Sequence, residues 1–238
     1  RKEIGLPFYC LIRPNLIPEE MMRLLSEAGC YSVNMSIEAG SEEFRYKVLN
    51  RKMSDSVIYN AFNIVHKYHV NIYANSMLGL PFARIKDELA TVDMMTRCKP
   101  SFPSFTIFTP FKGVELTELA EKHNLITREI KESTWAASIL NCFTDREKKI
   151  QVNIMHLGAA ACRWPILQPL ILKCLIYLPP NRLFFLIWVL LKNYLMTKHI
   201  FPVKALVLKK INYGIKIFLS EFRLISYQKA GNSIKWRI

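Results

Sequence analysis

Four short polar loops follow apolar segments in the first half of this chain, at residues 13–15, 38–41, 79–82 and 110–113. The first three begin with Arg13, Glu38 and Gly79. A guanidinium can bind a carboxylate through two parallel hydrogen bonds, a carboxylate can accept hydrogen bonds from two hydroxyls, and a glycine lets a ligand approach the backbone closely. These loops therefore hold residue types that could bind a small molecule, provided that the fold brings them together.

The cysteines and histidines give only weak evidence for a metal site. The six cysteines are at least 12 residues apart, so no CxxC pair and no pattern typical of zinc or iron–sulfur sites is present. We interpret them as reduced thiols that pack as small hydrophobic side chains, and we expect no disulfide framework. His66 and His69 are three residues apart on a predicted helix, but the sequence offers no third metal ligand beside them. No dinucleotide-binding, P-loop, HExxH or GxSxG motif occurs.

Strand-like and helix-like segments alternate over the first 125 residues. The predicted strands are residues 6–12, which we expect to be buried, 31–37, 70–80 and 104–108. The predicted helices begin at Pro18 and at residues 55, 85 and 114, and end near residues 29, 68, 97 and 123. This order favours parallel strands joined by crossover helices, in an open α/β sheet or a (β/α) barrel. In both folds ligands bind at the carboxyl ends of the strands, where the four loops would meet.

The character of the sequence changes beyond about residue 150. Residues 1–150 carry a net charge of +2, whereas residues 151–238 hold 13 Lys and Arg and one acid, Glu221, and carry +12. The longest charge-free apolar stretch, residues 183–191, would give ~14 Å of helix against ~30 Å of bilayer hydrocarbon, so we expect no transmembrane span. Prolines divide this part of the chain, so we expect short helices. Its apolar stretches are residues 164–172, 174–180, 183–191, 205–208 and 215–219.

Two interpretations of this basic, apolar tail remain open. Its Trp and Tyr rings, together with Lys and Arg, suit helices that lie on an anionic membrane. Alternatively, the tail is an ordinary helical subdomain that packs on the first module and keeps its basic face in water. We expect no binding to nucleic acid, because the tail is too apolar for a solvated groove-binding face.

Three ordered motifs in the first half carry a resemblance to a known family: LLSEAGCYSVNMSIEAGSEEFRYKVLNRKMS, NSMLGLP and FTIFTPFKGVEL. In the same order, they resemble segments of radical S-adenosylmethionine proteins, and the match is closest to the cobalamin-binding group. The resemblance covers residues 6–130. It departs from the family pattern at Ala39, where Ser is usual, and at residues 82–84, where the family has Gly-Glu-Thr.

The resemblance implies a (β/α) barrel in which residues 6–12 form about the third strand. It also implies that this chain is a C-terminal fragment, as the missing initiator Met indicates. Members of the family use a [4Fe–4S] cluster to cleave S-adenosylmethionine reductively to a 5′-deoxyadenosyl radical. The CxxxCxxC motif that holds the cluster is absent here and would lie upstream of Arg1, as would a cobalamin domain. We therefore expect no metal ligands in this chain.

The resemblance also assigns roles to five residues. Glu38 would end the fourth barrel strand and bind the ribose hydroxyls of S-adenosylmethionine, and Arg51 would pair with its methionyl carboxylate. Asn75 would end the fifth strand and, with Gly79, contact the adenosyl group. Arg13 would end the third strand and face cofactor or substrate. The alternatives are structural: a solvated or capping Glu38, a surface Arg51 and simple turn chemistry at Gly79.

We therefore predict three regions: residues 1–130 as the C-terminal half of a radical S-adenosylmethionine barrel, 131–150 as a linker and 151–238 as a basic, apolar helical tail. The full-length enzyme is expected to generate a 5′-deoxyadenosyl radical or to transfer methyl groups to an unactivated carbon of a small or lipid-like substrate. The isolated chain is expected to be inactive. The alternative is a membrane-surface scaffold with a degenerate barrel. We expect a cytoplasmic protein with peripheral contact to the inner face of an anionic membrane.

Overall fold

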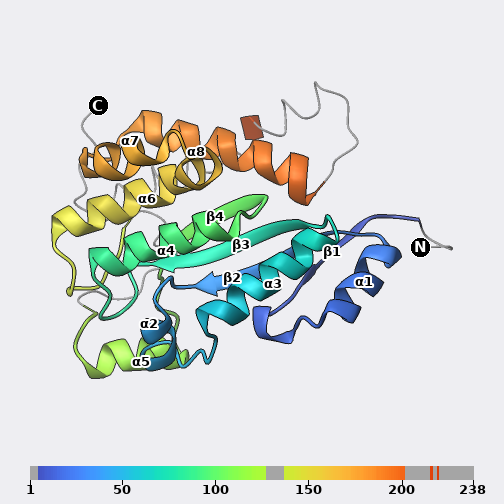
Figure 1. Ribbon diagram of the computed structural model, residues 1–238. Helices are drawn as coiled ribbons and strands as arrows, with labels where there is room; N and C mark the ends of the chain where they lie inside the picture. The colour runs from blue at the N-terminus through green and yellow to red at the C-terminus, as the bar shows by residue number, and fades with distance from the viewer. Residues whose placement is uncertain (1–4, 127–136, 202–214, 217–218, 220–238) are drawn as a thin grey trace.

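A computed structural model describes residues 5–126 and 137–201, together with residues 215, 216 and 219 (Figure 1). Its first part alternates strands and helices, which confirms the predicted order and adds a short helix, α2, that the sequence pattern did not predict. The elements are β1 (Phe8–Leu11), η1 (Pro14–Leu16), α1 (Glu19–Ala28), β2 (Cys30–Glu38), α2 (Glu42–Lys47), α3 (Asp55–Lys67), β3 (Asn71–Leu78), α4 (Ile85–Cys98), β4 (Phe102–Ile107) and α5 (Glu115–Lys122). The second part is helical and consists of α6 (Asp145–Arg163), α7 (Gln168–Lys173), η2 (Leu175–Tyr177), α8 (Arg182–Leu195) and η3 (Met196–Ile200).

The four strands form one parallel sheet in the order β1-β2-β3-β4. The chain moves one strand further across the sheet after each crossover, as expected of successive β-α units. All four strands therefore end at the same edge of the sheet, on the side where α2 and α5 lie (Figure 1). The structure confirms a mixed α/β fold with a parallel sheet. Within the described residues this sheet is open, with β1 and β4 at its edges.

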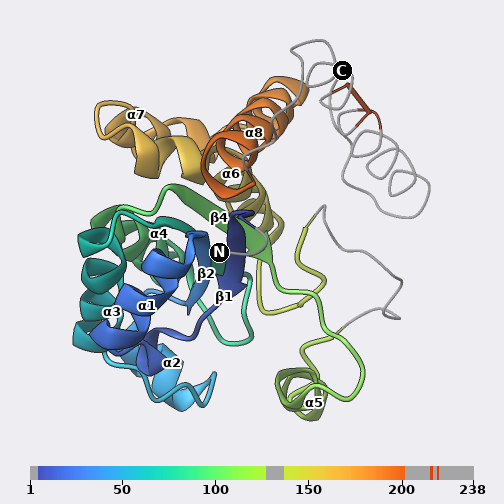
Figure 2. The ribbon, with the colours of Figure 1, turned by 90° about the vertical axis from the view of Figure 1, so that its right-hand side faces the viewer.

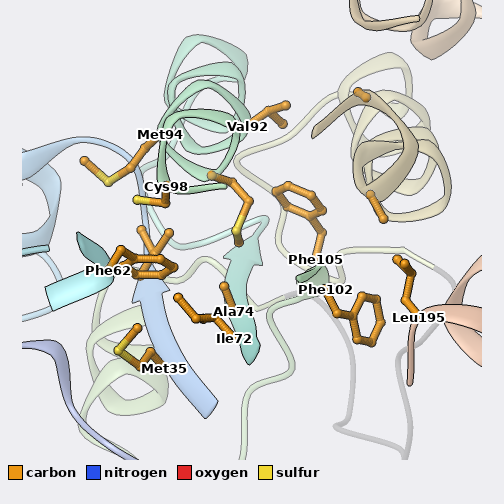
Figure 3. Close-up of a cluster of buried hydrophobic side chains, with 14 of the residues drawn as sticks. Met35, Phe62, Ile72, Ala74, Val92, Met94, Cys98, Phe102, Phe105 and Leu195 are labelled. Atoms are coloured by element: carbon orange, nitrogen blue, oxygen red, sulfur yellow. The ribbon is translucent and has the colours of Figure 1, made fainter. Parts of the chain in front are cut away.

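One face of the sheet is covered by α1, α3 and α4 (Figure 2). Side chains alternate between the two faces of a strand, and in β3 every second residue is buried. Figure 3 shows Ile72 and Ala74 of β3 among apolar side chains of the helices, such as Phe62 of α3 and Met94 of α4. Burial of this apolar surface is the dominant favourable contribution to folding.

The opposite face of the sheet is polar and half-buried. Asn75 of β3 donates from Nδ2 to Oδ1 of Asn34 of β2 at 2.7 Å, and Ser36 donates to the Asn75 carbonyl at 3.3 Å. The Tyr73 hydroxyl lies 3.5 Å from Oγ of Ser104 of β4. Hydrogen bonds between neighbouring strands thus satisfy much of this polar face.

The prediction that residues 6–12 form a buried strand was wrong in one respect. The strand exists, but Phe8, Tyr9 and Leu11 are exposed. Among the described strands, β1 lies at the edge of the sheet and pairs with β2 alone. Apolar composition favours a strand at the edge or at the centre of a sheet alike, so the sequence could not distinguish the two positions.

The helix α6 is buried on all sides from Ile150 to Ala161. It packs against β4 and α4 on one side and against α7, η2 and α8 on the other. It begins at Asp145, inside the range predicted as a linker, where Thr144 and Glu147 form a reciprocal capping box. In Figures 1 and 2, α7 and α8 lie over α6, on the side away from the sheet.

The helices α8 and η3 form one continuous 19-residue segment, Arg182–Ile200, with a mean hydropathy of 1.2. By length and composition alone it could cross a membrane, although 33% of it is buried inside the protein. It is longer than the predicted apolar stretch, because Lys192 does not interrupt the helix. Of the other predicted stretches, residues 205–208 and, within 215–219, residues 217 and 218 lie outside the described residues.

A buried carboxyl group joins the sheet to α6. Oε1 of Glu88, in α4, accepts the backbone N–H of Gly79 at 2.8 Å and Nε2 of Gln151, in α6, at 3.1 Å. The Glu88 side chain is almost completely buried, and this desolvation raises its pKa to about 8, against the opposing effect of the two donors. Glu88 is therefore largely protonated at neutral pH.

We expect the free energy of unfolding to fall as pH rises from about 5 to about 9. The folded state keeps the Glu88 proton up to about pH 8, whereas the unfolded state loses it near 4.5, so each pH unit between these values removes up to about 1.4 kcal/mol. Urea unfolding of the protein and of Glu88→Gln at both pH values measures this. The variant, which cannot ionise, should lose most of the decline.

Burial lowers the pKa of His156 to about 4, so this residue also makes stability depend on pH. Both the unaltered protein and Glu88→Gln contain His156, so its effect cancels in the difference between them. Glu43→Gln is the control, since Glu43 forms an exposed ion pair with Lys47. An equal decline in Glu88→Gln and in the unaltered protein would show that Glu88 is not the titrating group.

Candidate functional site

A cavity of about 860 Å³ lies at the carboxyl ends of the strands. Its walls come from the loops after β1 and β4, from the last residues of β2, β3 and β4, from residues 48–51 and from α5. Three of the five predicted site residues, Arg13, Glu38 and Arg51, line it. The volume lies within the range of small-molecule sites, about 300–1,000 Å³.

Glu38 is the last residue of β2 and has a left-handed backbone with φ of 66°. The pairing of β2 with β3 shifts between Ser36 and Glu38, so a bulge precedes this residue. A left-handed conformation costs a non-glycine residue roughly 1–2 kcal/mol and persists only where the surroundings enforce it. The turn therefore fixes the carboxylate, which is mostly buried, in the cavity wall.

Gly40 explains how the surroundings enforce that turn. A Cβ at this position would lie 2.3 Å from the backbone carbonyl carbon of Ala90, in α4. The Gly40 N–H also donates to Oγ1 of Thr91 at 2.8 Å. Only glycine can bring the backbone this close to α4, so the turn after Glu38 is pressed against that helix.

Arg51 reaches the cavity from the loop between α2 and α3. Its NH2 lies 3.5 Å from Oε1 of Glu38, and the Arg51 side chain is 40% exposed, against 15% for Glu38. Two opposite charges are thus presented together on one wall of the cavity. A half-exposed pair of this kind contributes little to stability, about 0–1 kcal/mol, which leaves it available for a ligand.

The fully buried guanidinium of Arg45, in α2, holds the Arg51 loop in place. It donates to the carbonyl oxygens of Ala39 at 2.8 Å and Met53 at 3.0 Å, and it pairs with Asp55. The Arg45 carbonyl in turn accepts the Arg51 N–H at 2.8 Å. Sequence reasoning missed Arg45, since a basic residue in a charged helix gives no signal that it will be buried.

Asn75 and Gly79 lie differently from the expectation. Asn75 is in the middle of β3 rather than at its end, bonded to Asn34 on the polar face of the sheet. Gly79 follows β3 with φ of 66°, but its N–H points to Glu88 and its Cα side faces Ser138 and Gln151. Neither residue lines the cavity. Gly79 serves the junction between the sheet and α6.

A second part of the cavity wall comes from α5 and the residues that precede it. It is mixed: Phe111, Val114 and Leu119 supply apolar surface, and Lys122 and Glu118 supply charge. The sequence pattern predicted the helix at residues 114–123 but did not show which side of it would face a cavity. Arg13, from the loop after β1, completes the polar part of the lining.

Within the part of the chain that the structure describes, no group of three or more His, Cys, Asp or Glu side chains is placed to hold a metal ion. His66, one of the two histidines considered above, lies with Nε2 at 3.0 Å from the carbonyl oxygen of Cys98. This contact gives His66 a structural role between α3 and the end of α4.

Comparison with known proteins gives partial matches. No family model matches the chain. An uncharacterized methyltransferase of Pyrococcus horikoshii is 24% identical over 114 residues, which is 48% of this chain and 25% of that protein. The chain thus spans about a quarter of the length of the curated relative that it matches.

Two solved structures show limited similarity. One is the radical S-adenosylmethionine methyltransferase TsrM of Kitasatospora setae with cobalamin and a [4Fe–4S] cluster bound, at a TM-score of 0.45 and 17% identity over 51% of this chain and 23% of that chain. The other is coproporphyrinogen III oxidase of Escherichia coli, described as a radical S-adenosylmethionine enzyme, at a TM-score of 0.48 and 14% identity over 65% of this chain and 32% of that chain.

Replacing Arg45 by Met should lower the free energy of unfolding by about 2–4 kcal/mol, because two buried carbonyl oxygens would lose their donor. Chemical unfolding measures the loss. Arg97→Met is the matched control: Arg97 pairs with Asp93 on the exposed side of α4, so its loss should change the free energy of unfolding little. Equal effects of the two substitutions would contradict the structural role of Arg45.

Proposed function

We propose that this chain supplies part of the S-adenosylmethionine site of a radical S-adenosylmethionine enzyme that transfers methyl groups, or abstracts hydrogen, at an unactivated carbon. The observation that carries the proposal is that Arg13, Glu38 and Arg51 line one cavity at the carboxyl ends of a parallel sheet. Glu38 and Arg51 belong to the first of the three sequence motifs, and Arg13 follows β1, the strand that precedes this motif. The relative described as a methyltransferase supports the methyl-transfer reaction.

The residues fit the proposed ligand chemically. Glu38 is mostly buried and held by a strained turn, so its carboxylate can accept hydrogen bonds from two adjacent ribose hydroxyls without first being ordered. Arg51 suits the methionyl carboxylate, which a guanidinium binds through two parallel bonds. Their single 3.5 Å contact leaves further guanidinium donors and the second carboxylate oxygen for the ligand. These residues would bind and orient the cofactor.

The apolar part of the cavity supports a class of substrate. Met77, Phe108 and Val114 present hydrophobic surface beside the polar pair. An aliphatic or lipid-like carbon could lie there, shielded from water, next to the bound cofactor. Polar and apolar walls in one cavity fit a polar cofactor beside an apolar substrate better than two polar ligands.

The chemistry itself would come from the [4Fe–4S] cluster, which cleaves S-adenosylmethionine, and in the cobalamin class from a cobalamin that carries the methyl group. We assign neither group to this chain, since its described residues do not form a metal site. On this proposal other parts of the enzyme supply both groups, and the isolated chain binds without turning over.

Equilibrium dialysis of the 238-residue chain against S-adenosylmethionine tests the proposal. Glu38→Ala and Arg51→Ala should each weaken binding by about 5- to 150-fold, equivalent to ~1–3 kcal/mol for lost hydrogen bonds to a charged group. Glu43→Ala and Arg97→Ala, which alter exposed ion pairs elsewhere, should leave the affinity unchanged.

Two outcomes would count against the proposal. If the chain binds no S-adenosylmethionine at millimolar concentration, the cavity serves another ligand or none, as the scaffold alternative requires. If all four variants bind as well as the unaltered chain, the ligand does not occupy the wall formed by Glu38 and Arg51.

A further inference from the structure

The outer layer of the second part exposes an unusual amount of apolar surface. α7 and α8 pack on α6 with their inner sides, so their outer sides face away from the sheet (Figures 1 and 2). In the turn before α7, Trp164 and Ile166 are exposed, the latter by 87%. In and after η2, Tyr177 and Leu178 are about half exposed. Large contiguous patches of this kind mark interaction surfaces.

The helix α8 is apolar on two sides. Its inner side buries Phe184, Val189 and Leu195 among others. Its outer side carries a stripe, which we call the α8 stripe, of four large side chains that are 38–61% exposed: Leu183, Leu186, Leu190 and Tyr194. Successive residues of a helix turn by about 100°, so positions separated by three, four and four residues lie within one narrow sector.

The charges around this surface have a single sign. No Asp or Glu occurs between Glu147 and Glu221. Over the same layer lie Arg163, Lys173, Arg182, Lys192 and Lys198. Nζ of Lys198 is bonded to the Tyr194 hydroxyl at 2.7 Å, which places a cation at the end of the α8 stripe. Apolar and aromatic side chains bordered by cations alone fit an anionic lipid surface.

The contacts of η3 hold the end of the Arg182–Ile200 segment against the sheet. The Tyr31 hydroxyl donates to the Lys198 carbonyl at 2.8 Å, and Oγ of Ser32 donates to the Ile200 carbonyl at 3.0 Å. Both donors belong to β2, so the end of the helix is bonded to the sheet. To span a bilayer, the segment would have to break these bonds and expose its inner side.

We propose that the outer face of α7, η2 and α8 is a peripheral docking surface for a membrane that contains anionic lipids. The apolar side chains of the α8 stripe insert at the headgroup boundary, and the flanking Lys and Arg pair with lipid phosphates. Each cation near the surface contributes within a Debye length, about 8–10 Å at physiological salt, so high salt weakens the attachment.

Cosedimentation of the full chain with vesicles tests this proposal. We expect binding to vesicles of equal parts phosphatidylcholine and phosphatidylglycerol, weak binding to phosphatidylcholine alone, and release by high salt. The triple variant Leu183→Ser/Leu186→Ser/Leu190→Ser should bind the anionic vesicles at least about tenfold more weakly, since three inserted side chains are lost. The triple variant retains every Lys and Arg, so a loss of vesicle affinity would measure the contribution of the apolar side chains.

The matched control is Leu11→Ser/Leu16→Ser/Leu24→Ser, which changes three leucines of β1, η1 and α1 that are each more than half exposed, and it should bind normally. Circular dichroism checks that both triples fold. A charge variant, Lys173→Gln/Arg182→Gln, should bind several-fold more weakly than its control Lys86→Gln/Lys99→Gln, which changes two exposed lysines in α4 and directly after it.

Several results would overturn the proposal. One is equal binding to the two kinds of vesicle; another is an equal loss in the α8 triple and its control. Retention of the chain in vesicles after alkaline carbonate extraction would indicate insertion across the bilayer. Self-association without vesicles that depends on the α8 stripe would assign the face to a second copy of the chain. None of these measurements depends on S-adenosylmethionine binding, so they test the docking surface separately from the proposed function.

Discussion

The buried guanidinium of Arg45 fixes the geometry of the candidate site. A charge that is shielded from water is tolerated only where its donors are satisfied and an opposite charge is near, and Arg45 meets both conditions through Ala39, Met53 and Asp55. These partners belong to the turn after β2, to the loop before α3 and to the first turn of α3. Three segments are therefore held at one point, and the positions of Glu38 and Arg51 relative to each other follow from it.

The same turn is constrained from the other side by close packing. Gly40 lies against the backbone of α4, and the bulge before Glu38 rotates the end of β2. The strain at Glu38 is thus offset by contacts on both sides of the turn, which is the condition under which such strain persists. A polar group held this rigidly can bind a ligand without a large loss of conformational entropy, whereas a side chain on a mobile loop cannot.

Much of the fold could be predicted from the sequence, but less of the site could. Periodicity identified the four strands and their crossover order, and parallel topology then required Arg13 and Glu38 to share one edge. The exposure of β1 depends on which strands neighbour it, and a single sequence does not contain that information. The direction of Gly79 depends on Glu88 and Gln151, which are 9 and 72 residues further along the chain. Such long-range contacts arise only from the packing of α4 and α6.

The helix α6 organises the second half of the chain, and α8 packs on it with only one of its two apolar sides. Nδ2 of Asn153 binds the carbonyl oxygens of Ile176 and Leu178 at 3.0 and 2.7 Å, and this fixes η2 to α6 while α8 packs beside it. The inner side of α8 is sufficient for this packing. The leucines on its outer side leave 38–61% of their surface exposed, and in water this apolar surface imposes a cost in solubility. A helix with apolar residues on both sides is favourable where a second apolar environment is present, and on the docking proposal that environment is the surface of an anionic membrane.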